Sequence, residues 1–308
     1  MWRYVLTRLL QGAAVIFLVA TAAFLILRLT PGSPVDVMVG EADVTPQQVA
    51  AIKHLWGFDR PWYVQYATWL ANMARGDFGE SVIRTGVPVG TMLAQAAPVT
   101  ITLNAAAFAL SVAIAVPVGI VAGVRRYTAF DYIGTVGATL GVALPSFWIS
   151  LMAIILFAVK LRWLPPFGLQ SWTGYVLPVA VLATEQAAVI TRMMRGSVAA
   201  VLHQDYVRTG RAKGLAESRV VLRHAVRNAL LPVVTVLGYR MAFLLSGTII
   251  VETVFALPGV GRLLTDSVYH LDYQVVQVIA LVLAVIVVAA NIATDLIYAF
   301  VDPRIRVG

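Results

Sequence analysis

Side chains that could make or break covalent bonds are few and widely separated in this sequence. Cysteine is absent, and the sequence holds neither an HExxH nor a GxSxG motif. The four histidines are scattered along the chain, at His54, His203, His224 and His270. Serine and aspartate within apolar segments leave a membrane-embedded hydrolase open as an alternative, but no spacing favours it. We therefore predict no catalytic residue, no metal site and no enzymatic activity.

The chain also lacks a motif that binds the phosphates of a nucleotide. Lysine occurs only at Lys53, Lys160 and Lys213, and none of the three completes a Walker A pattern. Without that glycine-rich loop and its lysine, the chain has no recognisable cradle for the phosphates of ATP. Any ATP-driven work must therefore come from a separate chain.

The most informative polar stretch is residues 203–227, HQDYVRTGRAKGLAESRVVLRHAVR. Gly210 and Gly214 keep part of its surface small, and Gly214 can end a short helix as a C-cap. A basic loop held by anionic lipid is one interpretation. The two glycines and a tyrosine between charges favour a docking element for a partner protein. Helical spacing relates Tyr206, Thr209, Lys213 and Ala216.

Composition places these residues in a membrane protein. The chain is 60% hydrophobic and 12% charged, with a mean hydropathy of +0.83. An ordinary soluble domain is about 45–50% apolar and about 25% charged. The apolar residues come in long blocks, and about 20 of them span a bilayer as a helix, which satisfies its own backbone. We therefore predict an all-α integral membrane protein with a single transmembrane domain over residues 1–308.

Six spanning helices are predicted. The charged start followed by an apolar core could be a signal peptide, but the core exceeds the usual length of about 7–15 residues, which favours a retained anchor. Pro145 should kink the third helix. The expected spans are residues 9–27, 99–124, 132–159, 175–190, 231–251 and 275–300.

The loops between these spans differ in charge, which predicts the orientation of the chain. Basic residues gather on one side, at Arg3, Arg8, Arg125, Arg126, the stretch 192–227, Arg304 and Arg306. The other side is mainly acidic, although Arg28, Lys160 and Arg162 also fall there. The positive-inside rule then puts both termini in the cytoplasm. This placement of the +8 formal charge argues against nucleic-acid binding.

A long extracytoplasmic insertion is expected over residues 30–98. Thr45 should cap a helix that has Pro46 in its first turn. A second helix should open at Pro61 and either lie at the membrane interface or dock a partner. Residues 76–79, GDFG, predict a turn. The apolar face of the second helix would hold Trp62, Tyr66, Trp69, Leu70 and Met73.

Polar residues inside predicted spans require an explanation, because a charge at the bilayer centre costs about 2.5–3.5 kcal/mol or more. Arg240 could line a translocation cavity and meet an anionic group of the solute. It could equally form a structural pair with Glu185 or with an acid of a partner chain. A polar stripe on the last span favours helix–helix hydrogen bonding. Its members are Asn291, Asp295, Tyr298 and Asp302.

Residues 205–215, DYVRTGRAKGL, resemble the cytoplasmic coupling motif of ATP-binding-cassette importer permeases of the dipeptide and oligopeptide family. That family usually has Y-x-R-T-A-R-A-K-G, so Gly210 replaces an alanine. Gly214 alone matches the broader EAA template. Further resemblances run in order along nearly the whole chain, and the long first outer loop is typical of the B-type dipeptide permease subunit. They comprise residues 76–81, 145–148, 161–165, 251–255, 258–262 and 291–306.

The resemblance implies a type I importer permease fold in a bacterial plasma membrane, forming half of a translocation pathway for dipeptides or short peptides. It implies a homologous second permease, two cytoplasmic ATPases or one fused ATPase that bind ATP and Mg, an extracytoplasmic solute-binding protein and membrane lipid as partners. An importer for nickel or another non-peptide solute, and an uncoupled channel or scaffold, remain alternatives. The implied ATPase-coupling residues are Asp205, Tyr206, Arg208, Thr209, Gly210, Arg211, Ala212, Lys213, Gly214 and Leu215.

Overall fold

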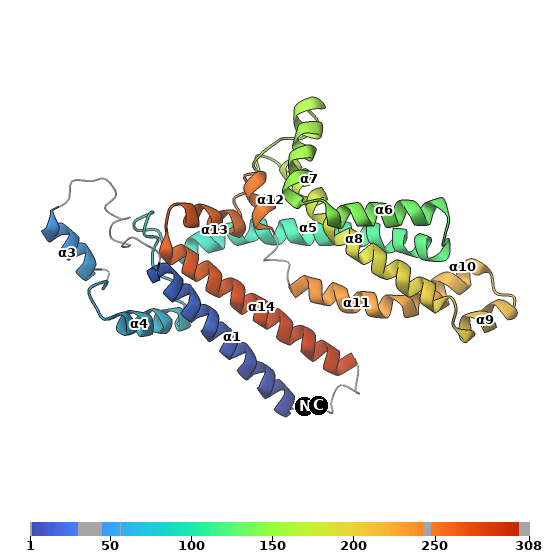
Figure 1. Ribbon diagram of the computed structural model, residues 1–308, viewed down its shortest axis with the longest axis horizontal. Helices are drawn as coiled ribbons and strands as arrows, with labels where there is room; N and C mark the ends of the chain where they lie inside the picture. The colour runs from blue at the N-terminus through green and yellow to red at the C-terminus, as the bar shows by residue number, and fades with distance from the viewer. Residues whose placement is uncertain (1, 30–44, 56, 243–247, 302–308) are drawn as a thin grey trace. The chain divides into compact units, whose positions relative to one another are not determined.

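The computed structural model describes residues 2–29, 45–55, 57–242 and 248–301. These residues form helices joined by short turns, and within them only an isolated bridge between Glu80 and Pro88 resembles strand pairing (Figure 1). The predicted all-α fold is therefore confirmed. The chain divides into unit 1, residues 1–99 and 259–308, and unit 2, residues 100–258.

Four helices of the described part are long and apolar enough to cross a membrane. The segments that meet this test are Val5–Leu25, Val89–Val124, Trp172–Val201 and Tyr273–Thr294. They belong to α1 (Trp2–Leu29), α5 (Val89–Val124), η2 (Trp172–Tyr175) with α8 (Val176–Val201), and α14 (Tyr273–Val301).

Two boundaries differ from the predicted ones by ten residues or more. The second span begins at Val89, ten residues early, because the helix continues through Pro98. Proline is tolerated in membrane helices, where neighbouring groups can satisfy the freed backbone. The fourth span continues past residue 190 to Val201, since buried Met194 and Val198 extend its packed face.

The third predicted span, residues 132–159, falls on a bent pair of helices, so a single span over these residues stays a prediction. α6 (Ala129–Ala143) and α7 (Ser146–Ala153) with the π-helical turn η1 (Ile154–Lys160) meet at 105°. Leu144 is extended, with φ −85° and ψ 128°, because a residue before proline disfavours the helical conformation. The predicted break at Pro145 is thus confirmed.

The fifth predicted span falls on α11 (Val226–Ala242) and α12 (Ile249–Val254). Residues 243–247 between them lie outside the described part of the chain. A single span over residues 231–251, and hence the count of six, stays a prediction.

Unit 1 is built on α1 and α14, which pack side by side. Gly12 allows this approach, because a Cβ there would lie 2.7 Å from Cγ1 of Val288. α4 (Trp62–Ala74) packs its Trp69 and Met73 into the same core. Trp62, in contrast, is 61% exposed and does not share the packed face predicted for it. The remaining helices of the unit are α3 (Pro46–Leu55) and α13 (Val260–Tyr269).

The predicted cap of α3 is confirmed. The backbone N–H of Gln48 donates to Oγ1 of Thr45 at 3.4 Å, and Gln48 accepts in return from the Thr45 N–H at 2.8 Å. This reciprocal pair is a capping box, which satisfies donors that the helix cannot pair itself. The predicted turn at GDFG is also present, with positive φ at Gly76 and Gly79.

Unit 2 is organised around α8. α5 approaches it through Gly119 and Gly123, where a Cβ would lie 2.6 Å from Cβ of Met194 and 2.8 Å from Cβ of Val198. This spacing of two glycines is the small-residue motif that brings membrane helices close together. α6 and α11 also pack on α8. These helices position the segment that follows α8.

Candidate functional site

The predicted coupling segment folds as a series of short helices between α8 and α11. It contains α9 (Asp205–Ala212), a turn, α10 (Glu217–Arg219) and the π-helical η3 (Val220–Ala225). Gln204 is extended, with φ −74° and ψ 148°, and opens α9. Gly214 has φ +73° and follows the end of α9, as its predicted role as a C-cap requires.

Apolar residues hold this segment against unit 2. Val207 of α9 and Val220 and Ala225 of η3 have no exposed surface. Val221 joins a core cluster that includes Ala115 of α5 and Met194 of α8. α9 is therefore anchored on one side, and a displacement of it must strain its contacts with the spanning helices.

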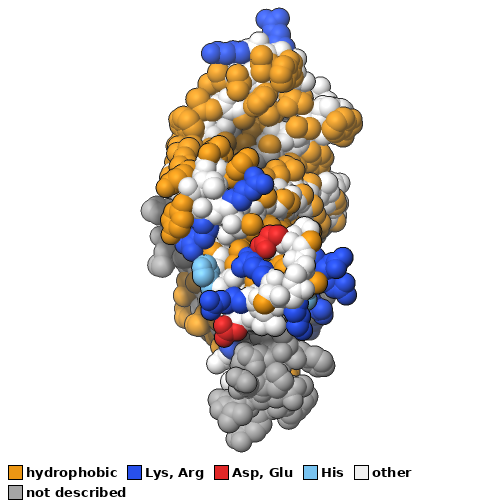
Figure 2. Space-filling view, turned by 90° about the vertical axis from the view of Figure 1, so that its right-hand side faces the viewer, with side chains coloured by type: hydrophobic (Ala, Val, Ile, Leu, Met, Phe, Trp, Pro, Cys, Tyr) orange, Lys and Arg blue, Asp and Glu red, His pale blue; other side chains and the backbone are white. Residues whose placement is uncertain are grey.

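The opposite side of the segment is open and basic. Tyr206 is 43% exposed, and the side chain of Arg208 is 77% exposed. Of the predicted coupling residues, Asp205, Thr209, Arg211, Ala212, Lys213 and Gly214 are also exposed, and Gly210 and Leu215 are half-buried. Figure 2 faces the end of unit 2 that carries α9 and shows more Lys and Arg than Asp and Glu side chains on it.

Gly210 occupies the position where the coupling motif that this segment resembles usually has alanine. A Cβ at this position would lie 3.8 Å from Cδ1 of Leu215 and 3.9 Å from Cγ2 of Val220, which are ordinary van der Waals contacts. The structure therefore has room for the usual alanine. Gly214 differs from Gly210, because its positive φ disfavours any residue with a side chain.

Two polar contacts that were not predicted from the sequence stabilise the segment. Arg211 donates through Nη2 to Oε1 of Glu217 at 2.7 Å and through Nε to Oε2 at 3.1 Å. This pair lowers the pKa of Glu217 and raises that of Arg211. Both side chains are about half exposed, so the pair adds at most about 1 kcal/mol. Asn228 of α11 donates to the hydroxyl of Tyr206 at 2.8 Å.

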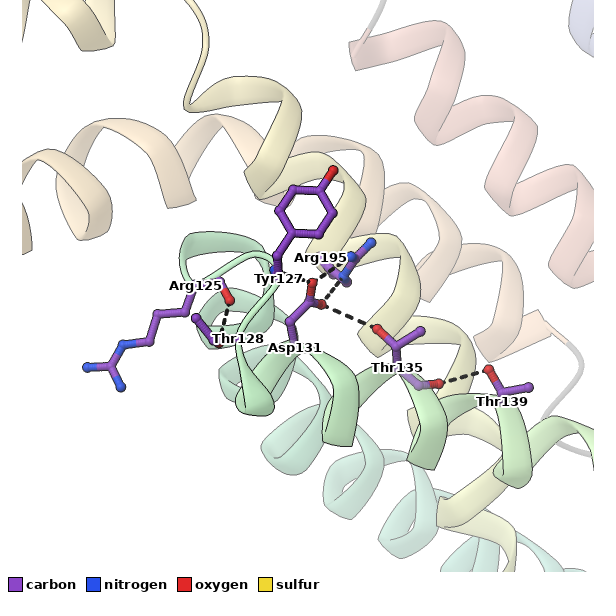
Figure 3. Close-up of polar contacts among 7 residues, drawn as sticks. All are labelled: Arg125, Tyr127, Thr128, Asp131, Thr135, Thr139 and Arg195. Atoms are coloured by element: carbon purple, nitrogen blue, oxygen red, sulfur yellow. Dashed lines mark hydrogen bonds and ion pairs between the residues drawn. The ribbon is translucent and has the colours of Figure 1, made fainter.

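A partly buried ion pair joins α6 to α8 (Figure 3). Arg195 donates to both carboxylate oxygens of Asp131, with 2.8 Å from Nη2 to Oδ2. Asp131 also accepts from the Tyr127 N–H at 3.0 Å and from Thr135 Oγ1 at 3.3 Å, and it is 3% exposed. Such bidentate geometry is the strong form of an arginine–carboxylate contact.

The sequence pattern places Arg195 in the basic stretch and indicates no role for Asp131. The two residues are 64 positions apart, so the local pattern could not pair them. A signal was nonetheless present, since Asp131 is the acid in the first turn of α6, five residues after Arg126.

The family-like motifs outside the coupling segment make structural contacts. Ser81 donates its hydroxyl to Oδ2 of Asp272, and the Val82 N–H donates to Oδ1 of the same residue at 3.1 Å. Gln274 donates to the carbonyl of Phe78 at 2.7 Å. These bonds fix the residue 76–81 turn, GDFGES, to the start of α14.

Glu252 of the residue 251–255 motif is fully buried in unit 2. Its Oε1 accepts from Thr100 at 2.8 Å and from Thr248 at 2.9 Å. A buried acid of this kind requires hydrogen-bond partners. Glu252 thus ties α12 to α5.

The predicted cavity and stripe residues are described only in part. Glu185 is exposed on α8, while the side chain of Arg240 on α11 lies outside the described part, so their pairing stays a prediction. Asn291 is half-buried on α14. The side chains of Asp295 and Tyr298, and the whole of Asp302, are likewise outside the described part.

Comparison with known proteins shows to which family the chain belongs. A family model described as "Binding-protein-dependent transport system inner membrane component" matches residues 115–307, and the model for the N-terminal part of such components matches residues 1–115. The chain belongs to this family. It is accordingly an inner-membrane transport subunit and not itself an enzyme, and it works with a solute-binding protein and an ATPase.

Full-length relatives agree with this family, and a solved structure shares the fold. The oligopeptide transport system permease protein AppB of Bacillus subtilis is 36% identical, over 98% of this chain and 99% of that protein. The oligopeptide transport system permease protein OppB of Haemophilus influenzae is 37% identical, over 99% and 100%. An amino acid ABC transporter of known structure shares the fold, with a TM-score of 0.53 at 12% identity, covering 68% of this chain and 93% of that one.

Proposed function

We propose that this chain is one of two permease subunits of an ATP-driven importer for short peptides, and that α9 docks into a cytoplasmic ATPase. Support for the peptide substrate comes from the full-length relatives, which are oligopeptide permeases. Support for the coupling role comes from α9, which is exposed and basic on one side and anchored by buried residues on the other.

The proposed coupling passes through the two helices that flank α9. Val207 and Val220 hold the segment from within, and Tyr206 binds Asn228 in the first turn of α11. α8 and α11 share one apolar core, so they should respond together when an ATPase displaces α9. ATP and Mg would be bound by two ATPase subunits, or by one fused ATPase.

The remaining partners follow from the same assignment. A homologous second permease would complete the pathway, and an extracytoplasmic binding protein would deliver the peptide. Both termini and α9 would lie in the cytoplasm, where the basic loops are expected. Residues 30–98 would then be extracytoplasmic.

Charge reversal on the open side of α9 tests the docking. We expect the double variant Arg208→Glu/Lys213→Glu to lower the amount of ATPase that copurifies with tagged permease by about tenfold, since like charges across an interface cost several kcal/mol. Arg211 is left unchanged because it already binds Glu217. The matched control is Arg75→Glu/Arg84→Glu, two exposed arginines of the insertion. Undiminished ATPase in the α9 variant would contradict the docking role.

A further inference from the structure

An apolar groove of about 710 Å³ lies in unit 2 between α5, α6 and α8. Its α5 wall follows one face of the helix for about 17 Å, at 1.5 Å per residue. The residues of this wall are Leu110, Ile114, Val118 and Val121. The α8 side of the groove consists of small side chains, mostly alanine, within residues 180–191. The groove is therefore long and mainly apolar.

Glycine keeps the α6 side of this groove open. A Cβ at Gly137, which lines the groove, would have no atom within 4 Å. Phe130 and Ile133 of the same helix also line it, and they are 56% and 71% exposed. Exposed apolar side chains around an apolar hollow mark a surface that another molecule covers. In a membrane protein that molecule is a lipid or another helix.

Arg125 lies at one end of the groove. It follows Val121 by four residues, and its N–H donates to the Val121 carbonyl at 2.9 Å, so it continues the same face of α5 by one turn. Its guanidinium carbon lies 5.2 Å from the ring centre of Phe130. The side chain points away from the Asp131–Arg195 pair (Figure 3), and within the described part of the chain no carboxylate forms an ion pair with it.

The dimensions of the groove favour a lipid over a helix. A helix with its side chains is about 10–12 Å wide, and two turns occupy about 1,000 Å³, so a helix would rest on the groove without filling it. An unfilled apolar floor would lose its dispersion contacts. An acyl chain carries no side chains, and the hydrocarbon of one leaflet is about 15 Å thick, close to the length of the groove.

The charge at the end of the groove favours a phospholipid. The phosphate of such a lipid lies at the end of its acyl chains, which is where Arg125 lies relative to the groove. Arginine binds phosphate through two parallel hydrogen bonds. A basic pocket beside membrane helices is also the kind of site that attracts anionic headgroups.

We propose that this groove binds one acyl chain of an anionic phospholipid and that Arg125 binds the phosphate of the same molecule. On the predicted orientation, Arg125 faces the cytoplasm, so the lipid belongs to the inner leaflet. The site involves neither the peptide nor the ATPase, and it does not rest on the proposed function.

Photolabelling of the assembled transporter tests the proposal. The complex is reconstituted in phosphatidylcholine nanodiscs with a trace of phosphatidylglycerol that carries a diazirine on one acyl chain, and the labelled peptides are identified by mass spectrometry. We expect label on the parts of α5, α6 and α8 that line the groove. Phosphatidylcholine with the same diazirine chain should give about fivefold less label, which is the preference that one basic residue near a membrane surface confers.

Two pairs of variants separate the headgroup from the acyl chain. Arg125→Gln should lower labelling by phosphatidylglycerol about fivefold, whereas the control Arg126→Gln should leave it unchanged, because Arg126 lines a different pocket beside α9. Gly137→Leu should fill the groove and lower labelling by both lipids. Its control is Gly196→Leu, on α8 outside the groove, where a Cβ also meets nothing within 4 Å.

Three results would overturn the proposal. Equal labelling of the groove by the two lipids in the wild type would exclude a headgroup site. Equal losses in Arg125→Gln and Arg126→Gln would mean that the basic surface attracts lipid without a defined site. A groove without label in the assembled complex would mean that a protein segment, such as a helix of a second permease, covers it. None of these results bears on the proposed function, because labelling requires neither peptide nor ATPase docking.

Discussion

Replacing Gly214 by alanine isolates the backbone geometry that ends the coupling helix. No atom lies within 4 Å of a Cβ built at this position, so the methyl group itself meets no obstacle. The free-energy cost of the substitution therefore comes entirely from the φ of +73°. A left-handed conformation costs a residue with a Cβ about 1–2 kcal/mol.

That cost should appear as easier opening of α9. At about 1.4 kcal/mol per tenfold change, the opening equilibrium should rise about 5- to 30-fold. Hydrogen–deuterium exchange of the α9 amides, measured by mass spectrometry at a pH where the helix closes faster than its amides exchange, should accelerate by the same factor. Exchange in α5 and α14 should not change.

Gly210 provides the matched control within the same helix. Its Cβ would meet Leu215 and Val220 at 3.8 and 3.9 Å, and its φ is helical. Gly210→Ala should therefore stabilise α9 by about 0.5–1 kcal/mol and slow its exchange. Equal exchange rates in Gly214→Ala and the wild type would refute the assignment of Gly214 as the residue that shapes the segment.

Two further predictions concern the helices that carry α9. Asp131→Asn should lower the free energy of unfolding by about 2–4 kcal/mol, because it leaves the partly buried Arg195 without its carboxylate. In thermal melts of the detergent-solubilised complex, the control Asp205→Asn, at an exposed site, should change the stability little. Equal melting of the two variants would contradict the role of the pair. Gly119→Val should separate α5 from α8 and reduce assembled complex in size-exclusion chromatography, since overpacking costs about 1–3 kcal/mol or more. Gly137→Val, where nothing lies within 4 Å of the Cβ, is the control, and similar loss of complex in both would contradict the close approach.

Local features of the structure were predictable because their causes are local. Pro145 breaks its span since the residue before a proline avoids the helical conformation. Gly214 ends α9, and Thr45 begins α3, through capping rules that act within a few residues. The family could be recognised from the sequence because each of its motifs consists of a few consecutive residues, and the motifs follow one another in the expected order.

Features that depend on tertiary contact could not be predicted. Asp131 and Arg195 meet only because α6 packs on α8. The start of the second span was wrong because Pro98 resembles a boundary, although it lies inside α5. Aromatic periodicity indicated only that α4 lies at the membrane interface or docks a partner, whereas the structure packs Trp69 and Met73 of this helix into the core of unit 1.

Crosslinking from α9 tests most directly the claim that this helix docks into a cytoplasmic ATPase. Because the chain has no native cysteine, an introduced cysteine is the only thiol of this subunit that can react. A single cysteine introduced as Lys213→Cys, at an exposed position beyond the end of α9, would be crosslinked in inside-out membrane vesicles that contain the whole transporter. We predict a crosslink to the ATPase subunit whose yield changes when ATP is added. A cysteine that reacts only from the extracytoplasmic face, or that crosslinks to no ATPase with or without ATP, would contradict the account.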